Sequence, residues 1–192
     1  YGKKLIQHVF EKIKKSRKVK IIVSTSTNKK DDKLVKFLID KKVKYFRGSL
    51  NNVAKRVYDT AISEKKSFFL RISGDSPLID FRLINKSINI FEKNRNFDLI
   101  TNIFPRTFPS GQSVEIIKTK TLGKNLRFFS KLDKEHVTRY FYKNLSKFKI
   151  KNFLNNKNNK NKKLSIDTHN ELKTILKSFT KKKFLNYNYL NE

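Results

Sequence analysis

The chain has 192 residues, of which 46 are Lys or Arg and 16 are Asp or Glu, so its formal net charge is +30. Its hydrophobic content of 37% and aromatic content of 12% exclude a disordered chain, and its length suits one domain with a sizeable core. The absence of Cys excludes disulfide scaffolds, thiolate zinc sites and cysteine nucleophiles. No apolar run approaches the roughly 18 residues that span a bilayer, and the amphipathic N-terminus is not a signal peptide, so we expect a soluble, cytoplasmic protein.

Short apolar runs alternate with amphipathic segments along the chain. The runs predict strands over 19–23, 43–46, 67–72, 98–102, 113–117, 148–154 and 163–166. Apolar positions spaced three and four residues apart predict helices over 4–15, 31–41, 52–63, 81–93, 121–129, 133–144 and 168–179. Asp80 is placed to cap the helix that begins at Phe81, and Thr168 with Glu171 forms a capping-box pattern.

This alternation predicts the α/β fold class, with a doubly wound and mostly parallel sheet. There is no internal repeat, and we assign residues 1–180 to a single domain. Residues 155–163 are a low-complexity run of Asn and Lys, which predicts a solvated loop. Residues 181–192 are interpreted as a tail.

The loops after the predicted strands are the first places to look for a site, because open parallel sheets bind ligands beyond the carboxyl ends of their strands. Two of these loops contain an isolated acid, Asp75 and Asp167, in a chain that has few acids. Two carboxylates at one sheet edge predict a shared Mg²⁺ site, because this ion prefers oxygen ligands and substrate phosphates. In the competing interpretation each acid only caps a turn or a helix, and spacing alone favours this second interpretation.

The strong nucleotide and hydrolase motifs are absent. The five Gly residues fit neither a Gly-rich dinucleotide loop nor a Walker A loop. The three His residues share no metal-ligand spacing, and there is no Gly-x-Ser-x-Gly elbow. Zinc enzymes and triad hydrolases therefore have no support, and His8, beside an apolar face, is interpreted as structural.

The net charge raises the alternative of a nucleic-acid-binding protein. Lys, however, is spread over nearly every segment, together with abundant Asn, Ile and Phe. An AT-rich coding bias produces this composition without any ligand, so we rank the compositional explanation first. The densest basic stretches are Lys12–Lys20, Lys157–Lys163 and Lys181–Lys183.

Six segments taken together resemble the motifs of one family. Residues Phe69–Asp80 contain Arg-Ile-Ser-Gly-Asp-Ser-Pro-Leu-Ile-Asp, which resembles the family signature RITGDCPLID. The other five, in chain order, are Ile22–Asp32 (VATTTNPEDD), Tyr45–Val53 (FRGSEDDV), Asn102–Pro109 (NTLPRTYPDG), Glu135–Tyr142 (EHVTPYIY) and Ser165–Thr168 (TVDTPED). Over nearly its whole length the chain therefore resembles the acylneuraminate (CMP-sugar) cytidylyltransferases of the spore coat polysaccharide SpsF type.

The resemblance implies a glycosyltransferase-A-like fold and the transfer of CMP from CTP to a sugar acid, with Mg²⁺ as cofactor and pyrophosphate as product. It implies that Asp75 and Asp167 bind the metal and act in catalysis with Arg71. It implies substrate contacts for Asn102, Arg106, Glu115 and His136, and nucleotide contacts for Thr25, Arg47, Ser49 and Gly74. Relatives in the family commonly pair, so a homodimer is also expected.

Three departures from the family pattern qualify this expectation. The family begins with a strand and a loop of the type QARMGSTRLPGK, upstream of the segment that Tyr1–Leu5 resembles, and the chain also lacks Met. We therefore expect an N-terminal truncation that lacks the first strand and binds CTP weakly. Residues 110–113 lack the two acids of the family's DGLD, and Arg139 stands where Pro is common. The alternatives are an inactive homologue used for binding or assembly and, third, a nucleic-acid-binding protein.

Overall fold

The computed structural model describes residues 2–16 and 19–191. The helices are α1 (Leu5–Ile13), α2 (Asp32–Asp40), α3 (Val53–Ser63), α4 (Phe81–Lys93), α5 (Thr119–Asn125), α6 (Lys131–Glu135), α7 (Arg139–Lys143), α8 (His169–Ser178) and α9 (Lys181–Leu185). The strands are β1 (Val23–Ser26), β2 (Tyr45–Gly48), β3 (Phe68–Arg71), β4 (Leu99–Thr101), β5 (Glu115–Lys118) and β6 (Ile150–Asn152). Four short 3-10 turns are η1 (Lys29–Asp31), η2 (Leu126–Phe128), η3 (Leu145–Lys147) and η4 (Tyr189–Asn191).

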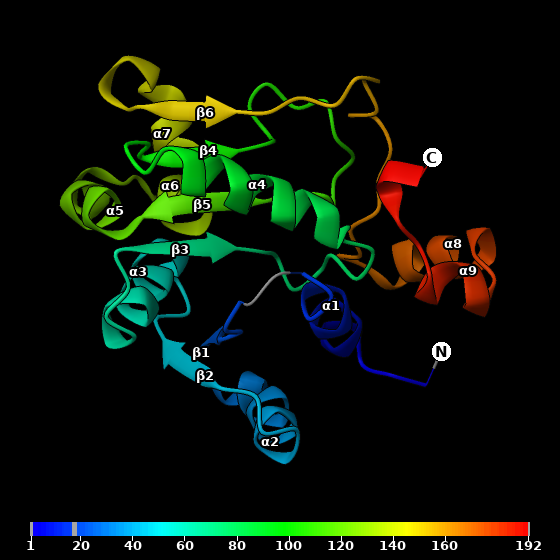
Figure 1. Ribbon diagram of the computed structural model, residues 1–192. Coiled ribbons are helices and arrows are strands. Elements are labelled where there is room, and N and C mark those ends of the chain that lie inside the picture. Colours follow the sequence, from blue (N-terminus) through cyan, green and yellow to red (C-terminus); the bar gives the residue numbers. More distant parts are fainter. Residues whose placement is uncertain (1, 17–18, 192) are drawn as a thin grey trace.

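The strands form two sheets (Figure 1). β1 and β2 make a parallel pair, and a four-stranded sheet has the order β3-β5-β4-β6. β5 is antiparallel to both of its neighbours and β4 is parallel to β6, so β3, β4 and β6 share one direction. The predicted α/β class and its mostly parallel sheet are therefore confirmed, with β5 as the reversed strand of the larger sheet.

The larger sheet is covered on both faces. Ile100 and Ile116 belong to one core cluster, in which they pack with α4 residues. Leu99 and Ile117, one position along the same strands, belong to a second cluster with residues of α3, α5 and α7. Because successive side chains of a strand point to opposite faces, the two clusters are the two sides of one sheet. Figure 1 shows α4 in front of the sheet and α6 and α7 behind it, which is the doubly wound arrangement that the sequence predicts.

The predicted helix over 133–144 is wrong in one respect, because the structure has two helices there. α6 ends with His136 as its C-cap, and α7 begins after Thr138. Val137 and Thr138 in the break are both buried, and the Thr138 hydroxyl donates a hydrogen bond to Glu115. The inward turn of these two residues places polar groups of α7 beside the larger sheet.

Two strand predictions also need correction. β1 begins at Val23 and continues through residues 24–26, beyond the predicted end of the strand at residue 23, because Thr25 and Ser26 pair in register with Arg47 and Gly48. Residues 163–166 do not form a strand of either sheet, and they contribute only an isolated bridge between Ser110 and Lys163.

The described part of residues 181–192 is not a separate tail. α9 begins at Lys181, and Phe184, Tyr187 and Tyr189 are buried in the same core cluster as Val9 of α1. The Lys12 ammonium donates hydrogen bonds to the main-chain oxygens of Leu185 and Tyr187. The C-terminal segment is therefore part of the domain. None of the described helices has the length and hydropathy that a membrane-crossing helix requires.

Candidate functional site

A buried carboxylate on β5 is the centre of a polar network at one end of the larger sheet. Glu115 is fully buried and lies opposite Arg71 in the antiparallel register of β3 and β5. Its Oε2 accepts a hydrogen bond from Arg71 Nη1 at 2.7 Å. Its Oε1 accepts hydrogen bonds from the Thr138 hydroxyl at 2.6 Å and the Tyr142 hydroxyl at 2.9 Å. A buried charge is tolerated only when it is paired and hydrogen-bonded, so this network fixes the Arg71 guanidinium in place.

Tyr142 is held in the network from its other side as well. The Thr101 hydroxyl lies 2.9 Å from the Tyr142 hydroxyl. Burial, and next the nearby negative charge of Glu115, raise the pKa of Tyr142, so the phenol stays protonated and donates a hydrogen bond to Glu115. The Tyr142 ring stacks on Phe104, with ring centroids 4.7 Å apart and planes 14° from parallel. These contacts leave the phenol little freedom to turn.

A cavity of about 470 Å³ opens beside this network, which is a size that suits a small-molecule site. Its lining consists of Arg71, Ile103, Phe104, His136, Val137, Thr138, Arg139, Tyr142 and Lys143. Three of these residues are basic, and no lining residue is an acid. We call this hollow the α7 cavity. Its lining predicts an anionic ligand that also presents a flat or apolar face to the aromatic pair.

The α7 cations are held by a second buried acid. Arg139 Nη1 lies 2.8 Å from Asp133 Oδ1 on α6, and Lys143 Nζ lies 3.9 Å from the same oxygen. The other Asp133 oxygen accepts hydrogen bonds from the Ser130 amide and hydroxyl, in the capping box that begins α6. Both sets of cations at the cavity are therefore anchored from behind by buried carboxylates.

The predicted substrate residues have different positions relative to this cavity. His136 lines it together with Arg71, which the resemblance assigns to catalysis, and Glu115 lies directly behind Arg71. Arg106 is half-buried and donates weakly to the Ser113 hydroxyl at 3.3 Å. Burial lowers the pKa of Arg106, while the nearby Glu115 opposes the shift. These residues form one group, although they come from β3, β5 and two loops.

Asn102 lies apart from that group. Its side chain is fully buried, and both ends of its amide are used inside the protein. Nδ2 donates to the main-chain oxygen of Gln112 at 2.7 Å, and Oδ1 accepts from the Val114 amide at 2.9 Å. The structure therefore gives Asn102 the role of a brace for the loop before β5, in place of the predicted substrate contact.

Three of the four predicted nucleotide residues lie at the ends of β1 and β2. The Thr25 hydroxyl donates to Asp31 Oδ2 at 2.9 Å. Arg47 Nη2 lies 2.7 Å from Asp32, and Arg47 Nε donates to the main-chain oxygen of Ser26. Ser49 is exposed, and its hydroxyl oxygen accepts a hydrogen bond from the amide of Asn52, the N-cap of α3. This is a second polar cluster, on the smaller sheet.

The fourth predicted nucleotide residue, Gly74, lies in the loop after β3 with the predicted metal ligand Asp75. A Cβ at Gly74 would lie 3.3 Å from Ile6 of α1. The Asp75 carboxylate accepts hydrogen bonds from the Ser73 hydroxyl at 2.8 Å and the Ser76 hydroxyl at 2.7 Å. Asp75 is thus tied into its own turn, as the competing interpretation expects, and it remains partly exposed.

Asp167 lies on a segment that runs beside the Asp75 loop. The Ile166 amide donates to the main-chain oxygen of Asp75 at 2.8 Å. The Asp167 carboxylate is half-exposed and pairs with Lys163 at 2.9 Å, while the cap of α8 is Thr168. No cluster of three or more His, Cys, Asp or Glu suited to a metal occurs among the described residues. Two carboxylates on adjacent segments fit Mg²⁺, which keeps several waters and phosphate oxygens as its other ligands.

Gly111 controls how closely the segment before Asp167 approaches the sheet. It has φ +85°, a conformation that favours glycine. A Cβ at this position would lie 2.5 Å from the carbonyl carbon of Leu164 and 2.6 Å from the amide nitrogen of Ser165. The two backbones are therefore in direct contact, beside the bridge between Ser110 and Lys163.

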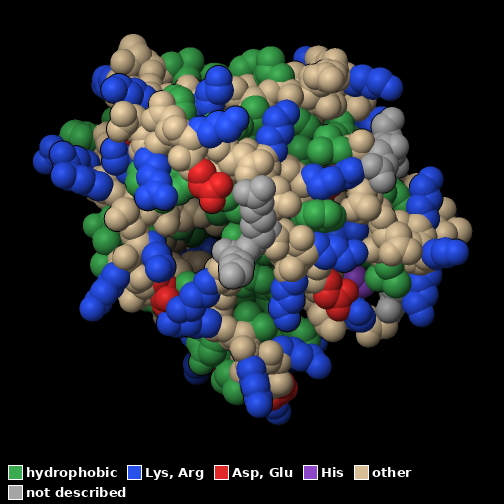
Figure 2. Space-filling model, in the orientation of Figure 1, with side chains coloured by type: hydrophobic (Ala, Val, Ile, Leu, Met, Phe, Trp, Pro, Cys, Tyr) green, Lys and Arg blue, Asp and Glu red, His purple; other side chains and the backbone are tan. Residues whose placement is uncertain are grey.

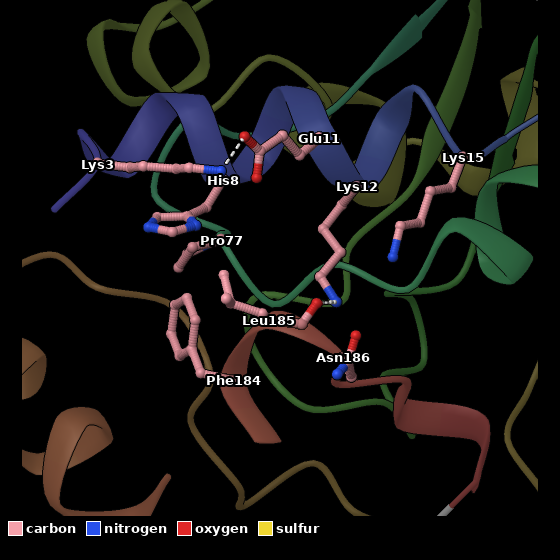
Figure 3. A pocket seen from close by; sticks show the side chains of 9 residues that line it. All are labelled: Lys3, His8, Glu11, Lys12, Lys15, Pro77, Phe184, Leu185 and Asn186. Atoms are coloured by element: carbon pink, nitrogen blue, oxygen red, sulfur yellow. Dashed lines mark hydrogen bonds and ion pairs between the residues drawn. The ribbon is translucent and has the colours of Figure 1, made fainter. Parts of the chain in front are cut away.

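A smaller hollow of about 230 Å³ lies between α1 and the C-terminal segment, and we call it the α1 cavity (Figure 3). It is also basic, because Lys3, Lys12 and Lys15 line it. Lys3 pairs with Glu11 at 2.6 Å, and Lys12 is buried with its ammonium hydrogen-bonded to backbone oxygens. Burial, aided by the charge of Lys15, lowers the pKa of Lys12 to about 8. None of the predicted site residues lines this cavity.

The sequence did not identify several residues that line or support the α7 cavity. Thr138 and Tyr142 lie in a segment that resembles a family motif, yet that resemblance gave them no role. Arg139 was noted only as a departure from the family pattern, and the capping-box spacing of Ser130 and Asp133 was not used. The available signal was the i, i+4 spacing of Thr138 and Tyr142, which places both hydroxyls on one face of a helix.

The fold and this site define a nucleotidyltransferase-like α/β protein, and comparisons with known proteins agree. A cytidylyltransferase family model matches residues 1–190, so the chain belongs to the cytidylyltransferase family. An uncharacterized protein of Methanocaldococcus jannaschii is 33% identical over 148 residues, covering 76% of this chain and 59% of that protein. The spore coat polysaccharide biosynthesis protein SpsF of Bacillus subtilis is 28% identical over 123 residues, covering 62% and 49%. The chain thus spans about half to three-fifths of these curated relatives.

Solved structures share this fold. A cytidylyltransferase from Leptospira borgpetersenii superposes with a TM-score of 0.88 at 27% identity, covering 100% of this chain and 82% of that one. A CMP:2-keto-3-deoxy-manno-octonic acid synthetase complexed with CTP superposes with a TM-score of 0.66 at 12% identity, covering 91% and 86%. The second likeness concerns the fold alone.

Proposed function

We propose that this protein transfers CMP from CTP to a sugar acid and releases pyrophosphate. The observation that carries the proposal is the α7 cavity, whose lining contains Arg71, Arg139 and Lys143 and no acid. A cavity of this charge favours a carboxylate-bearing acceptor, and the planar guanidinium of Arg71 matches a carboxylate. Membership in the cytidylyltransferase family and the SpsF relative support CTP as donor and a surface polysaccharide as the destination.

In the proposed reaction a hydroxyl of the sugar acid attacks the α-phosphorus of CTP in line. The bond between the α-phosphorus and the oxygen bridging to the β-phosphate breaks, pyrophosphate leaves with that electron pair, and the hydroxyl proton passes to solvent. This chain contributes positioning: Glu115 holds Arg71, and Arg71 orients the acceptor carboxylate. His136 is exposed at the edge of the same cavity, within reach of acceptor hydroxyls.

Asp75 and Asp167 would hold Mg²⁺ in this proposal. The ion supplies neutralisation of the charge that develops on the phosphates when it is bound. Both carboxylates are at least partly accessible, and the hydrogen bond between Ile166 and Asp75 keeps their segments together. Thr25, Arg47, Ser49 and Gly74 are the proposed nucleotide contacts. A cytoplasmic location and a homodimer remain predictions.

The test is pyrophosphate release from CTP with a panel of sugar acids and Mg²⁺. We expect release that requires a sugar acid and that falls by at least about 100-fold in Asp75→Asn and in Asp167→Asn. Asp59→Asn removes a carboxylate that pairs with Lys55 on α3, and this control should retain activity. Full activity in Asp75→Asn would overturn the metal assignment. Absence of release with every acid in the unaltered protein would overturn the proposed function and favour an inactive binding homologue.

The distribution of charged side chains on the displayed face gives little support to the nucleic-acid alternative. Figure 2 shows Lys and Arg side chains spread over the displayed face, with single acids among them. Nucleic-acid sites usually gather such charges into a patch or stripe. Salt-sensitive binding to random DNA that CTP leaves unchanged would favour this alternative.

A further inference from the structure

We propose that Arg139 and Lys143 bind a second anionic group of the acceptor, so that the preferred sugar acid carries two negative charges. The second group is a carboxylate or a phosphate ester placed away from the first carboxylate. This inference rests on the proposed function, because it concerns the acceptor in that reaction. It makes Arg139 and Lys143 specificity-determining residues, at a position where the family resemblance predicts Pro in place of Arg139.

The cations of the α7 cavity form two separate groups. Arg71 extends from β3 and is bound by Glu115. Arg139 and Lys143 extend from α7 and share the single carboxylate of Asp133. A sugar acid with one carboxylate would pair with only one of these groups.

The charges on α7 are incompletely compensated. Arg139 and Lys143 are four residues apart on one helix, where like charges repel each other. Both pair with one oxygen of Asp133, Arg139 at 2.8 Å and Lys143 at 3.9 Å, while the other oxygen accepts a hydrogen bond from Ser130. Two cations against one carboxylate leave one positive charge at the cavity wall. A bound anion would relieve the repulsion and complete the pairing.

The position of Arg139 is set by the fold. Asp133 lies in the capping box of α6, and the break at residues 136–138 turns α7 back toward the same carboxylate. The Arg139 side chain is about one-third exposed, so it is anchored at Asp133 and still accessible from the cavity. Such a preorganised guanidinium loses little freedom when it binds an anion.

The aromatic pair defines where the body of the acceptor would lie. Phe104 and Tyr142 are stacked and both line the cavity. Tyr142 lies between Arg139 and Lys143 in the sequence of α7. Its hydroxyl donates a hydrogen bond to Glu115, which also accepts one from Arg71. The aromatic surface is therefore tied to Arg71 through Glu115 and to Arg139 and Lys143 through α7. An acceptor with an anion at each end and a ring between them matches this order of groups.

The experiment compares matched acceptors in the whole protein with saturating CTP. The probes are 2-keto-3-deoxy-manno-octonic acid and its 8-phosphate ester, and a nine-carbon 2-keto sugar acid with and without a terminal phosphate or carboxylate. Acceptor KM and kcat are measured by pyrophosphate release, and calorimetry gives acceptor binding independently. In the unaltered protein we expect a lower KM and tighter binding for the doubly charged member of each pair.

Arg139→Gln should raise the KM of the doubly charged acceptor by at least about tenfold, with kcat and the CTP KM unchanged. The singly charged acceptor should be affected little. Arg139→Lys retains the charge and should recover most of the preference. Lys147→Gln, which removes an exposed lysine of η3 outside the cavity lining, is the matched control.

Equal losses for both acceptors in Arg139→Gln would overturn this inference, and so would a rise in the CTP KM, which would assign the α7 cations to the triphosphate. A preference for the singly charged acceptor in the unaltered protein would overturn it too. Inactivity with every acceptor would overturn the proposed function itself. If Arg139→Gln fails to fold, Lys143→Gln must show the same selective loss, and its absence would reject the inference.

Discussion

The two basic cavities of this protein differ in how their cations are held. In the α7 cavity, buried carboxylates bind Arg71 and Arg139 from behind, and the guanidinium groups line the hollow. In the α1 cavity, Lys12 is directed to the backbone oxygens of the C-terminal segment and Lys3 is paired with Glu11. Lys12 therefore joins α1 to the C-terminal segment. In a chain of charge +30 the number of cations says little, and their partners distinguish a ligand site from a structural contact.

The largest effect is expected from Glu115→Ala. This change leaves the Arg71 guanidinium and the hydroxyls of Thr138 and Tyr142 without their shared acceptor. Breaking a buried ion pair costs about 3–5 kcal/mol, so the free energy of unfolding should fall by that amount in urea titrations. Glu135→Ala, at the exposed end of α6, should change it by less than about 0.5 kcal/mol. Similar midpoints for Glu115→Ala and the unaltered protein would show that the network does not hold the cavity together.

A smaller effect, with a defined pH dependence, is expected at Lys12. Its pKa is about 8 in the folded protein and 10.5 ordinarily, so between these values the unfolded chain holds a proton that the folded protein has lost. The contribution of Lys12 to stability therefore rises with pH, by about 2 kcal/mol between about pH 8 and about pH 9.5. Lys12→Met should lack this rise, as shown by urea unfolding of both proteins across that range. Parallel pH profiles would place the Lys12 ammonium in water and remove the contrast between the cavities.

The smallest effect is expected from Tyr142→Phe. The substitution removes one hydrogen bond to Glu115 and the contact with the Thr101 hydroxyl, and it keeps the ring that stacks on Phe104. Because Arg71 and Thr138 still bind Glu115, the unfolding free energy should fall by about 1.5 kcal/mol. Tyr140→Phe, on the same helix but outside the cavity lining, should lower the unfolding free energy by less than about 0.5 kcal/mol. An equal loss in both variants would mean that the phenol contributes nothing specific to the network.

Elements with local determinants were predictable from the sequence. α4 spans the predicted residues 81–93, because the Asp80 side chain accepts from the Arg82 amide and an apolar stripe follows. α8 begins with the predicted capping box of Thr168 and Glu171. The break between α6 and α7 was not predictable in this way, because it depends on the contact of Thr138 with Glu115, 23 residues away.

The site was predictable only where a motif named its residues. Arg71, Glu115 and His136 followed from the resemblance, and the structure places them together at the α7 cavity. The packing of the C-terminal segment depends on Lys12, which binds residues 173 and 175 positions away. No local pattern encodes contacts of that separation, so the segment was interpreted as a tail.

The contact at Gly111 has a consequence for how this protein tolerates change. Its missing side chain leaves room for the backbone of Leu164 and Ser165, three and two residues before Asp167. In a saturation library selected for function, position 111 should therefore accept almost no replacement, even though glycine offers a substrate nothing to bind. The neighbouring loop of Asn and Lys residues should tolerate changes in composition. Position 111 should not, because a methyl group cannot replace the Cα hydrogen of glycine there.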